Sequence, residues 1–190
     1  MRKLIAAPLC AVALTLAACS GSDSGGNFAF HSPGGQTEIF YDEAERKPLA
    51  GLEGESLMDE GQTISLSDYD GQIVVLNAWG QWCAPCRAEV DDLEQIHEHL
   101  QEQNSGTLLG INVRDPNRQI ALDFLADNGV TYPSIYDPPF RTAANLGGVP
   151  SSVIPTTIVL DKHHRPAAVF LREINADDLL EVIDRLDREA

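Results

Sequence analysis

The pattern of hydrophobic and polar residues predicts an α/β domain built around one central strand. Residues 73–76 form an apolar run rich in β-branched side chains, which is typical of a buried strand. The next block spaces its apolar residues for one face of a helix: Val90, Leu93, Ile96 and Leu100. We expect this helix to end near Gln103. Residues 107–113 are strand-like again, so the three blocks predict a right-handed βαβ crossover with parallel strands.

The second half of the chain predicts further helices and strands. Asp115 is expected to cap a helix that begins at Pro116 and turns Ile120, Phe124 and Leu125 inward. The other expected elements are a strand at 133–136, a short helix at 137–146, a hairpin of strands at 156–160 and 167–171, and a last helix capped by Asn175.

Before the central strand, the chain is more polar and its predicted elements are shorter. Residues 28–30 and 37–41 indicate a small N-terminal hairpin around a turn at Pro33. Residues 41–62 are polar and rich in Gly and Glu, which predicts a loop. Residues 63–71 predict a short strand and a turn that lead into the central strand.

Two cysteines, Cys83 and Cys86, lie where the central strand passes into the helix, with Ala84 and Pro85 between them. The first turn of a helix presents free N–H groups and the positive end of the helix dipole, which stabilise a thiolate. We therefore interpret Cys83 as the exposed, attacking sulfur and Cys86, one turn deeper, as the sulfur that resolves a mixed disulfide. The alternatives are a static disulfide and a zinc site, which would need a second Cys or His pair at ligand spacing.

The segment WGQWCAPCRAE resembles the active-site segment of the thioredoxin superfamily, specifically of its membrane-anchored, extracytoplasmic TlpA/ResA branch. The resemblance extends from about residue 63 to the C-terminus and is less specific in the N-terminal segment. It implies an α/β, thioredoxin-like fold with a central mixed sheet flanked by helices. To this we add the predicted N-terminal hairpin and a TlpA/ResA-type insertion within residues 115–148.

Ile154 and Pro155 immediately precede a predicted buried strand. In the superfamily, the matching proline is cis and packs against the disulfide, which leaves the preceding backbone free to pair with a substrate peptide. The resemblance therefore implies a cis Pro155, although cis bonds are uncommon before proline in general. The expected substrate groove consists of Trp82, Ala84, Pro85, Ile154 and Pro155.

Glu89 lies three residues after Cys86, in line with the apolar stripe of the predicted helix. Burial there would raise the pKa of its carboxyl and suit it to shuttle a proton near the resolving sulfur. A solvated Glu in the first helical turns is the alternative that spacing alone allows. The TlpA/ResA branch has an active-site glutamate at the matching position, which favours the shuttle. Ordinary thioredoxins place a buried Asp where this chain has Asn77, which cannot exchange a proton.

Residues 1–18 predict an export signal, because a basic start precedes an apolar stretch too short to span a bilayer. Residues 16–19, LAAC, resemble a bacterial lipobox, which implies cleavage before Cys19 and a diacylglyceryl anchor on its sulfur. A plain secretory signal is the alternative. Residues 19–27 are then a flexible tether, and residues 28–190 form one thioredoxin-like domain.

Composition narrows the possible functions. The formal net charge of −16 at pH 7 argues against binding nucleic acid or adhering to anionic lipid through charge. Of the four cysteines, Cys10 would leave with the signal and Cys19 would carry lipid, so the C-x-x-C pair holds the remaining thiols and suits exchange. His163 and His164 fall in a predicted turn, and we expect no metal and no cofactor.

Together these features predict a monomeric thiol-disulfide oxidoreductase, lipid-anchored on the outer face of the cytoplasmic membrane. The resemblance implies that it reduces apocytochrome c before haem attachment to C-x-x-C-H, with electrons from a membrane thiol carrier of the CcdA type. Other exported cysteine-containing proteins are alternative partners, and an oxidase that forms disulfides is an alternative activity. A copper-delivery protein is the alternative of another class, although such proteins use C-x-x-x-C spacing. A peroxidase ranks last.

Overall fold

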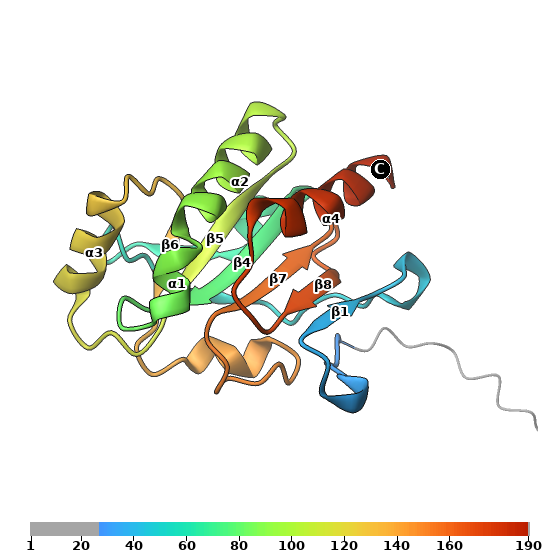
Figure 1. Cartoon of the computed structure of the whole chain (residues 1–190), viewed down its shortest axis with the longest axis horizontal. Helices are drawn as coiled ribbons and strands as arrows, with labels where there is room; N and C mark the ends of the chain where they lie inside the picture. The colour runs from blue at the N-terminus through green and yellow to red at the C-terminus, as the bar shows by residue number, and fades with distance from the viewer. Residues whose placement is uncertain (1–26, 190) are drawn as a thin grey trace, which may run out of the picture.

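The computed structural model describes residues 27–189, which form a mixed sheet with helices on its faces (Figure 1). Its six strands run in the order β1-β8-β7-β4-β5-β6. Their bounds are Glu38–Phe40 for β1, Ile73–Trp79 for β4, Gly106–Asn112 for β5, Ser134–Tyr136 for β6, Thr156–Leu160 for β7 and Pro166–Phe170 for β8. Strands β4, β5 and β6 are parallel, whereas β7, β8 and β1 each run antiparallel to their neighbours. The expected central mixed sheet is confirmed.

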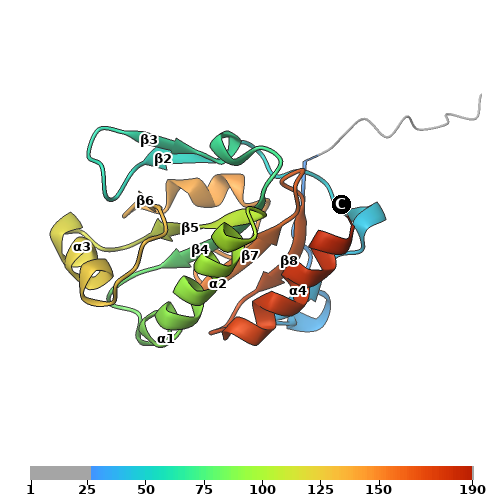
Figure 2. The same ribbon diagram turned by 90° about the horizontal axis from the view of Figure 1, so that it is seen from above.

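Two helices cover one face of the sheet, as the turned view shows (Figure 2). They are α2, Val90–Glu102, and α4, Ala176–Arg188, and their apolar faces share one core cluster with strand residues. On the other face, the 3-10 helix η4, Arg141–Asn145, and N-terminal segments form a second cluster. The short helix α1, Ala84–Ala88, precedes α2, and α3, Arg118–Asp127, lies beyond β6. This arrangement leaves α1 at the carboxyl end of β4.

The expected N-terminal hairpin is wrong. Residues 28–30 form no strand; instead the N–H of Phe28 donates to the carbonyl of Pro48 and that of Phe30 to Gly147. Strand β1 pairs antiparallel with β8, because the apolar side chain of Ile39 fills the core from the sheet edge. Residues 33–35 and 43–45 form single 3-10 turns, η1 and η2.

The predicted loop at 41–62 also contains a strand. Strand β2, Glu53–Glu55, pairs antiparallel with β3, Thr63–Ser65, in a separate two-stranded sheet. The 3-10 helix η3, Leu66–Tyr69, then leads into β4. Gly54 fits this position because a β-carbon there would lie 2.3 Å from the side chain of Ile135. The strand was missed because its contacts come from distant parts of the chain.

The start of α3 differs from the prediction. Asn117 caps the helix by accepting from the N–H of Gln119, so the helix begins two residues later than Pro116. Leu125 faces inward as predicted and Phe124 is half-buried, whereas Ile120 is 45% exposed and Ala121 is buried in its place. The expected insertion within residues 115–148 contains α3, β6 and η4. The final helix is capped by Asn175 as predicted.

No helix within residues 27–189 is long and apolar enough to cross a membrane. The predicted signal peptide, Cys19 and most of the predicted tether lie outside the described residues.

Candidate active site

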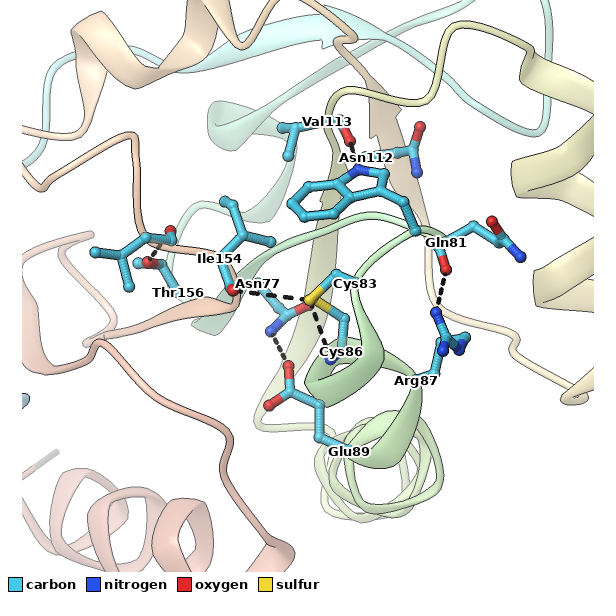
Figure 3. The surroundings of a disulfide bond; sticks show 12 residues. Asn77, Gln81, Cys83, Cys86, Arg87, Glu89, Asn112, Val113, Ile154 and Thr156 are labelled. Carbon is cyan, nitrogen blue, oxygen red and sulfur yellow. Dashed lines mark hydrogen bonds between the residues drawn. A yellow bond between two sulfur atoms is a disulfide. The ribbon is translucent and has the colours of Figure 1, made fainter.

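Cys83 and Cys86 form a disulfide at the point where β4 passes into α1. Their Cα atoms are 5.3 Å apart, and Cys83 is the N-cap residue of α1. The N–H of Cys86 donates to the Sγ of Cys83 over 3.2 Å (Figure 3). In the reduced protein, the same N–H would stabilise negative charge on this sulfur.

Both cysteines are buried in this disulfide form. Each is 3% exposed, and both belong to an apolar cluster with Trp79 and the half-buried Ile154. The expectation that Cys83 is exposed is therefore wrong. The physical reason is that its sulfur lies 3.7 Å from the carbonyl oxygen of Ile154, so the segment before β7 covers it.

The structure brings the expected groove residues to this end of the sheet. The peptide bond between Ile154 and Pro155 is cis, as the resemblance implied, and Pro155 is buried. Trp82 is 44% exposed, with its indole N–H donating to the carbonyl of Val113 over 3.0 Å. Ala84 is exposed and Pro85 half-buried at the start of α1. Trp79 lies in the core.

Glu89 is buried at the junction between α1 and α2. The single helix that we predicted to run to Gln103 is divided into two helices at this residue. The residue is 1% exposed. One carboxylate oxygen accepts from Nδ2 of Asn77 over 2.9 Å, and the other from the N–H of Ile174 over 3.0 Å. Burial raises the pKa of Glu89 to about 7, even though these two hydrogen bonds lower it. A solvated Glu89 is excluded.

Asp115 is a site residue that the sequence did not reveal. It is buried, and its carboxylate accepts from the N–H of Gln81 over 2.8 Å and from Nδ2 of Asn112 over 2.7 Å. It therefore holds the turn that precedes Cys83 to the end of β5. The local sequence predicted that Asp115 caps a helix, because Asp is common at the N-cap position. No local signal shows that its carboxylate instead binds the N–H of Gln81, 34 residues earlier in the chain.

His163 and His164 occupy the turn between β7 and β8. Pro155 precedes the first residue of β7, so the histidines lie at the opposite end of that strand from the disulfide. His164 contacts the carbonyl of Tyr69 through Nε2. A strand of five residues spans roughly 16 Å, too far for these histidines to share a metal ion with the cysteines. The geometry argues against the copper-delivery alternative.

A mixed sheet that carries a C-x-x-C disulfide at a helix start, opposite a cis-proline, defines a thioredoxin-like thiol-disulfide oxidoreductase. The chain belongs to the AhpC/TSA family, which residues 48–165 match.

Three proteins that are similar to this chain indicate more closely which thiol-disulfide oxidoreductases it resembles. A secreted thiol-disulfide isomerase from Corynebacterium glutamicum is 66% identical, with a TM-score of 0.83 over 85% of this chain and 98% of that one. A DsbF homologue from Corynebacterium diphtheriae is also 66% identical, with a TM-score of 0.81 over 85% of this chain and 100% of that one. The thiol-disulfide oxidoreductase ResA of Geobacillus thermodenitrificans is 28% identical over 127 residues, 67% of this chain and 70% of the relative. The chain is an extracytoplasmic thiol-disulfide oxidoreductase of the ResA type.

Proposed function

We propose that this protein exchanges its Cys83–Cys86 disulfide with cysteine pairs of exported proteins. Cys83 is the attacking sulfur and Cys86 the resolving one. The observation that carries this assignment is the contact of Cys83 with both the N–H of Cys86 and the carbonyl of Ile154. Cys83 thus lies between the helix start and the groove, whereas Cys86 lies one turn deeper, on the side of Glu89.

The reducing direction has two steps. The Cys83 thiolate attacks one sulfur of a substrate disulfide, forming a mixed disulfide and releasing the other substrate sulfur as a thiolate. Cys86 then gives its proton to the Glu89 carboxylate and attacks Cys83, which releases the second substrate sulfur. The substrate gains two electrons and the protein returns to its disulfide form. The oxidising direction is the reverse.

The substrate chain would lie across Ile154 and Trp82. The backbone before Pro155 would pair with an extended peptide, in the manner of an added strand. Trp82 offers an exposed aromatic face, and Ala84 and Pro85 form the floor beside the disulfide. These contacts are largely independent of substrate sequence, which suits an enzyme that acts on unfolded exported chains.

The specific substrate that we propose is apocytochrome c. Haem attachment to C-x-x-C-H requires both thiols, and an oxidising compartment converts them to a disulfide. A dedicated reductant solves this problem, and the likeness to proteins named ResA supports that role. A membrane thiol carrier of the CcdA type would return the electrons. The protein would act from the outer face of the cytoplasmic membrane, held by lipid on Cys19 after removal of residues 1–18.

A second candidate is an oxidase or isomerase that introduces or rearranges disulfides in exported proteins. One observation favours it: the two solved structures that are 66% identical are described as a thiol-disulfide isomerase and a DsbF homologue. Both candidates use the same residues and differ in the direction of electron flow.

The reduction potential of the Cys83–Cys86 pair separates the candidates. Equilibration in thiol buffers, followed by tryptophan fluorescence, would give about −270 mV for a reductant like thioredoxin and about −120 mV for an oxidant like DsbA. We expect the lower value. A potential near −120 mV would overturn the apocytochrome c proposal and favour the oxidase. A Cys83→Ser variant, which cannot form the disulfide, is the control that must show no transition.

A further inference from the structure

Asn77 lies at the centre of a buried polar trio beneath the disulfide. Its Nδ2 donates to Oε1 of Glu89 over 2.9 Å and to Oγ1 of Thr157 over 3.0 Å. Asn77 and Thr157 are fully buried and Glu89 is 1% exposed. The Oδ1 of Asn77 is also buried and has no hydrogen-bond partner among the described residues. A buried polar atom left without a partner is costly, so its presence beside a titrating group needs a reason.

Asn77, on β4, contacts both β7, which follows the cis-proline, and the junction between α1 and α2, which follows the cysteines. Asn77 is paired with Thr157 across β4 and β7, two residues after the cis Pro155. Its side chain points to the same face of β4 as Trp79, which packs with the cysteines, and toward Glu89 at the α1–α2 junction. Figure 3 shows the amide directed at the Glu89 carboxylate. Glu89 follows Cys86 by one helical turn, so the amide lies next to the proposed proton path.

An amide can serve both protonation states of a carboxyl group. The carboxylate only accepts hydrogen bonds, and the Nδ2 of Asn77 donates to it. A protonated Glu89 gains an O–H donor, which needs an acceptor. Turning the amide over exchanges Nδ2 for the unpartnered Oδ1, which can then accept from Glu89 and from the rotatable hydroxyl of Thr157. An aspartate or an aliphatic residue at position 77 lacks one or both of these capacities.

We propose that Asn77 is a positioning residue that keeps Glu89 hydrogen-bonded both as carboxylate and as carboxylic acid, so that the proton can move between Glu89 and Cys86. This inference rests on the proposed function. The charged groups that act on Glu89 from the surrounding elements are Asp92 on α2 and Glu173 before α4. Tyr132, before β6, also lies near, and the charge of Glu89 contributes to raising its pKa. Burial and, to a smaller extent, the two acidic groups raise the pKa of Glu89, so the uncharged donors of Asn77 and Ile174 are what favour its carboxylate.

The test is a carbon-13 NMR titration of the Glu89 carboxyl in the oxidised protein. Asn77→Leu keeps the approximate volume and removes both capacities. The hydrogen bond to the charged carboxylate is the stronger of the two that are lost, because charge-assisted hydrogen bonds are about twice as strong as neutral ones. We therefore expect the Glu89 pKa to rise by about one unit. Asn77→Asp adds a second carboxyl, and we expect the pair to titrate in two well-separated steps. Thr157→Val is the matched control; it removes the far contact and leaves the Glu89 contact, so its shift should be smaller than that of Asn77→Leu.

A Glu89 pKa unchanged from wild type in Asn77→Leu would overturn the inference, as would single-step titration near the wild-type value in Asn77→Asp. If Asn77→Leu fails to fold, as thermal unfolding would show, Asn77→Asp decides alone because it is isosteric. A separate experiment distinguishes failure of the Asn77 inference from failure of the proposed function: the rate of disulfide exchange is measured across pH for Glu89→Gln and for wild type. If Glu89→Gln exchanges like wild type, the shuttle role of Glu89 is wrong, whereas the NMR shifts still report whether Asn77 controls its protonation.

Discussion

Two buried carboxyl groups near opposite ends of β7 have different partners. At the active-site end, Glu89 is hydrogen-bonded by the uncharged groups of Asn77 and Ile174, and burial raises its pKa to about 7. At the other end, Asp161 lies 3.4 Å from the buried guanidinium of Arg46. Among the described residues, Glu89 is therefore hydrogen-bonded by uncharged groups, whereas Asp161 is in contact with arginine.

This pair belongs to a cluster of ion pairs formed by Arg46, Asp161, Arg165 and Glu189. Arg46 also binds Glu189 over 2.6 Å, and Arg165 binds Asp161 over 2.8 Å. The hydrogen bond from Arg46 holds the pKa of Glu189 below its usual range. These ion pairs tie the N-terminal segment and the end of α4 to the end of β7. The comparison shows that burial alone does not define a functional carboxyl: Asp161 is held in ion pairs, whereas Glu89, which is hydrogen-bonded by uncharged donors, has a raised pKa and can exchange its proton near neutral pH.

The largest expected effect comes from removing the cation. Arg46→Met should leave Asp161 buried beside one arginine instead of two and should release Glu189. Because the buried guanidinium and its hydrogen bonds to the carbonyl of Tyr41 and the carboxylates of Asp161 and Glu189 are lost, we expect a loss of about 3 kcal/mol in the free energy of unfolding, measured by denaturant titration. Disulfide exchange of the folded protein should be unchanged, since the cluster lies away from the cysteines. Equal stability in Arg46→Met and wild type would show that the cluster is not structural.

An effect of comparable size and opposite sign is expected from Glu89→Gln, and its size depends on pH. The folded-state pKa of about 7 lies above the usual 4.5. The folded state therefore binds more protons between these values, and wild-type stability falls as pH rises through this window. Gln cannot ionise, so Glu89→Gln should gain up to about 3 kcal/mol relative to wild type between about pH 5 and about pH 8.

Glu189→Gln is the matched control from the other cluster, with the opposite sign. Its lowered pKa means that its carboxylate stabilises the fold above the ordinary value and loses this contribution as pH falls through the folded pKa. The partly exposed ion pair stabilises the fold by up to about 1 kcal/mol. Glu189→Gln should therefore be less stable than wild type near neutral pH, and the two proteins should have the same stability in acid. If both variants show the same slope against pH, the comparison between the two sites is wrong.

The sequence predicted the elements whose signals are local. The apolar run of β4, the stripe of α2 and the cap at Asn175 each depend on neighbouring residues, and the structure confirms them. The cis bond at Pro155 could not be obtained from spacing; it came from the resemblance, and the structure contains it. Periodicity placed Glu89 on the apolar stripe, and its buried position agrees.

What the sequence missed depends on contacts between distant residues. Strand β1 pairs with β8 because Ile39 reaches the core there, a partner 130 residues away that no local pattern identifies. Asp115 looked like a helix cap, but its carboxylate is used by Gln81, which leaves the cap to Asn117. From the sequence, Asn77 was noted only because its amide cannot exchange a proton. Its hydrogen bonds to Glu89 and Thr157 could not be predicted, because they form only when β4, β7 and α1 come together.

The central claim is that Glu89 takes the proton of the resolving thiol, and the rate at which Cys86 resolves a mixed disulfide tests it most directly. The measurement would use the reduced protein, an oxidised C-x-x-C-H peptide and a series of pH values, with wild type and Glu89→Gln compared. In wild type the rate should rise through an inflection near the Glu89 pKa of about 7. In Glu89→Gln it should rise only as the thiol itself ionises, at about pH 8.5 or above. The same inflection near neutrality in both proteins would contradict the account.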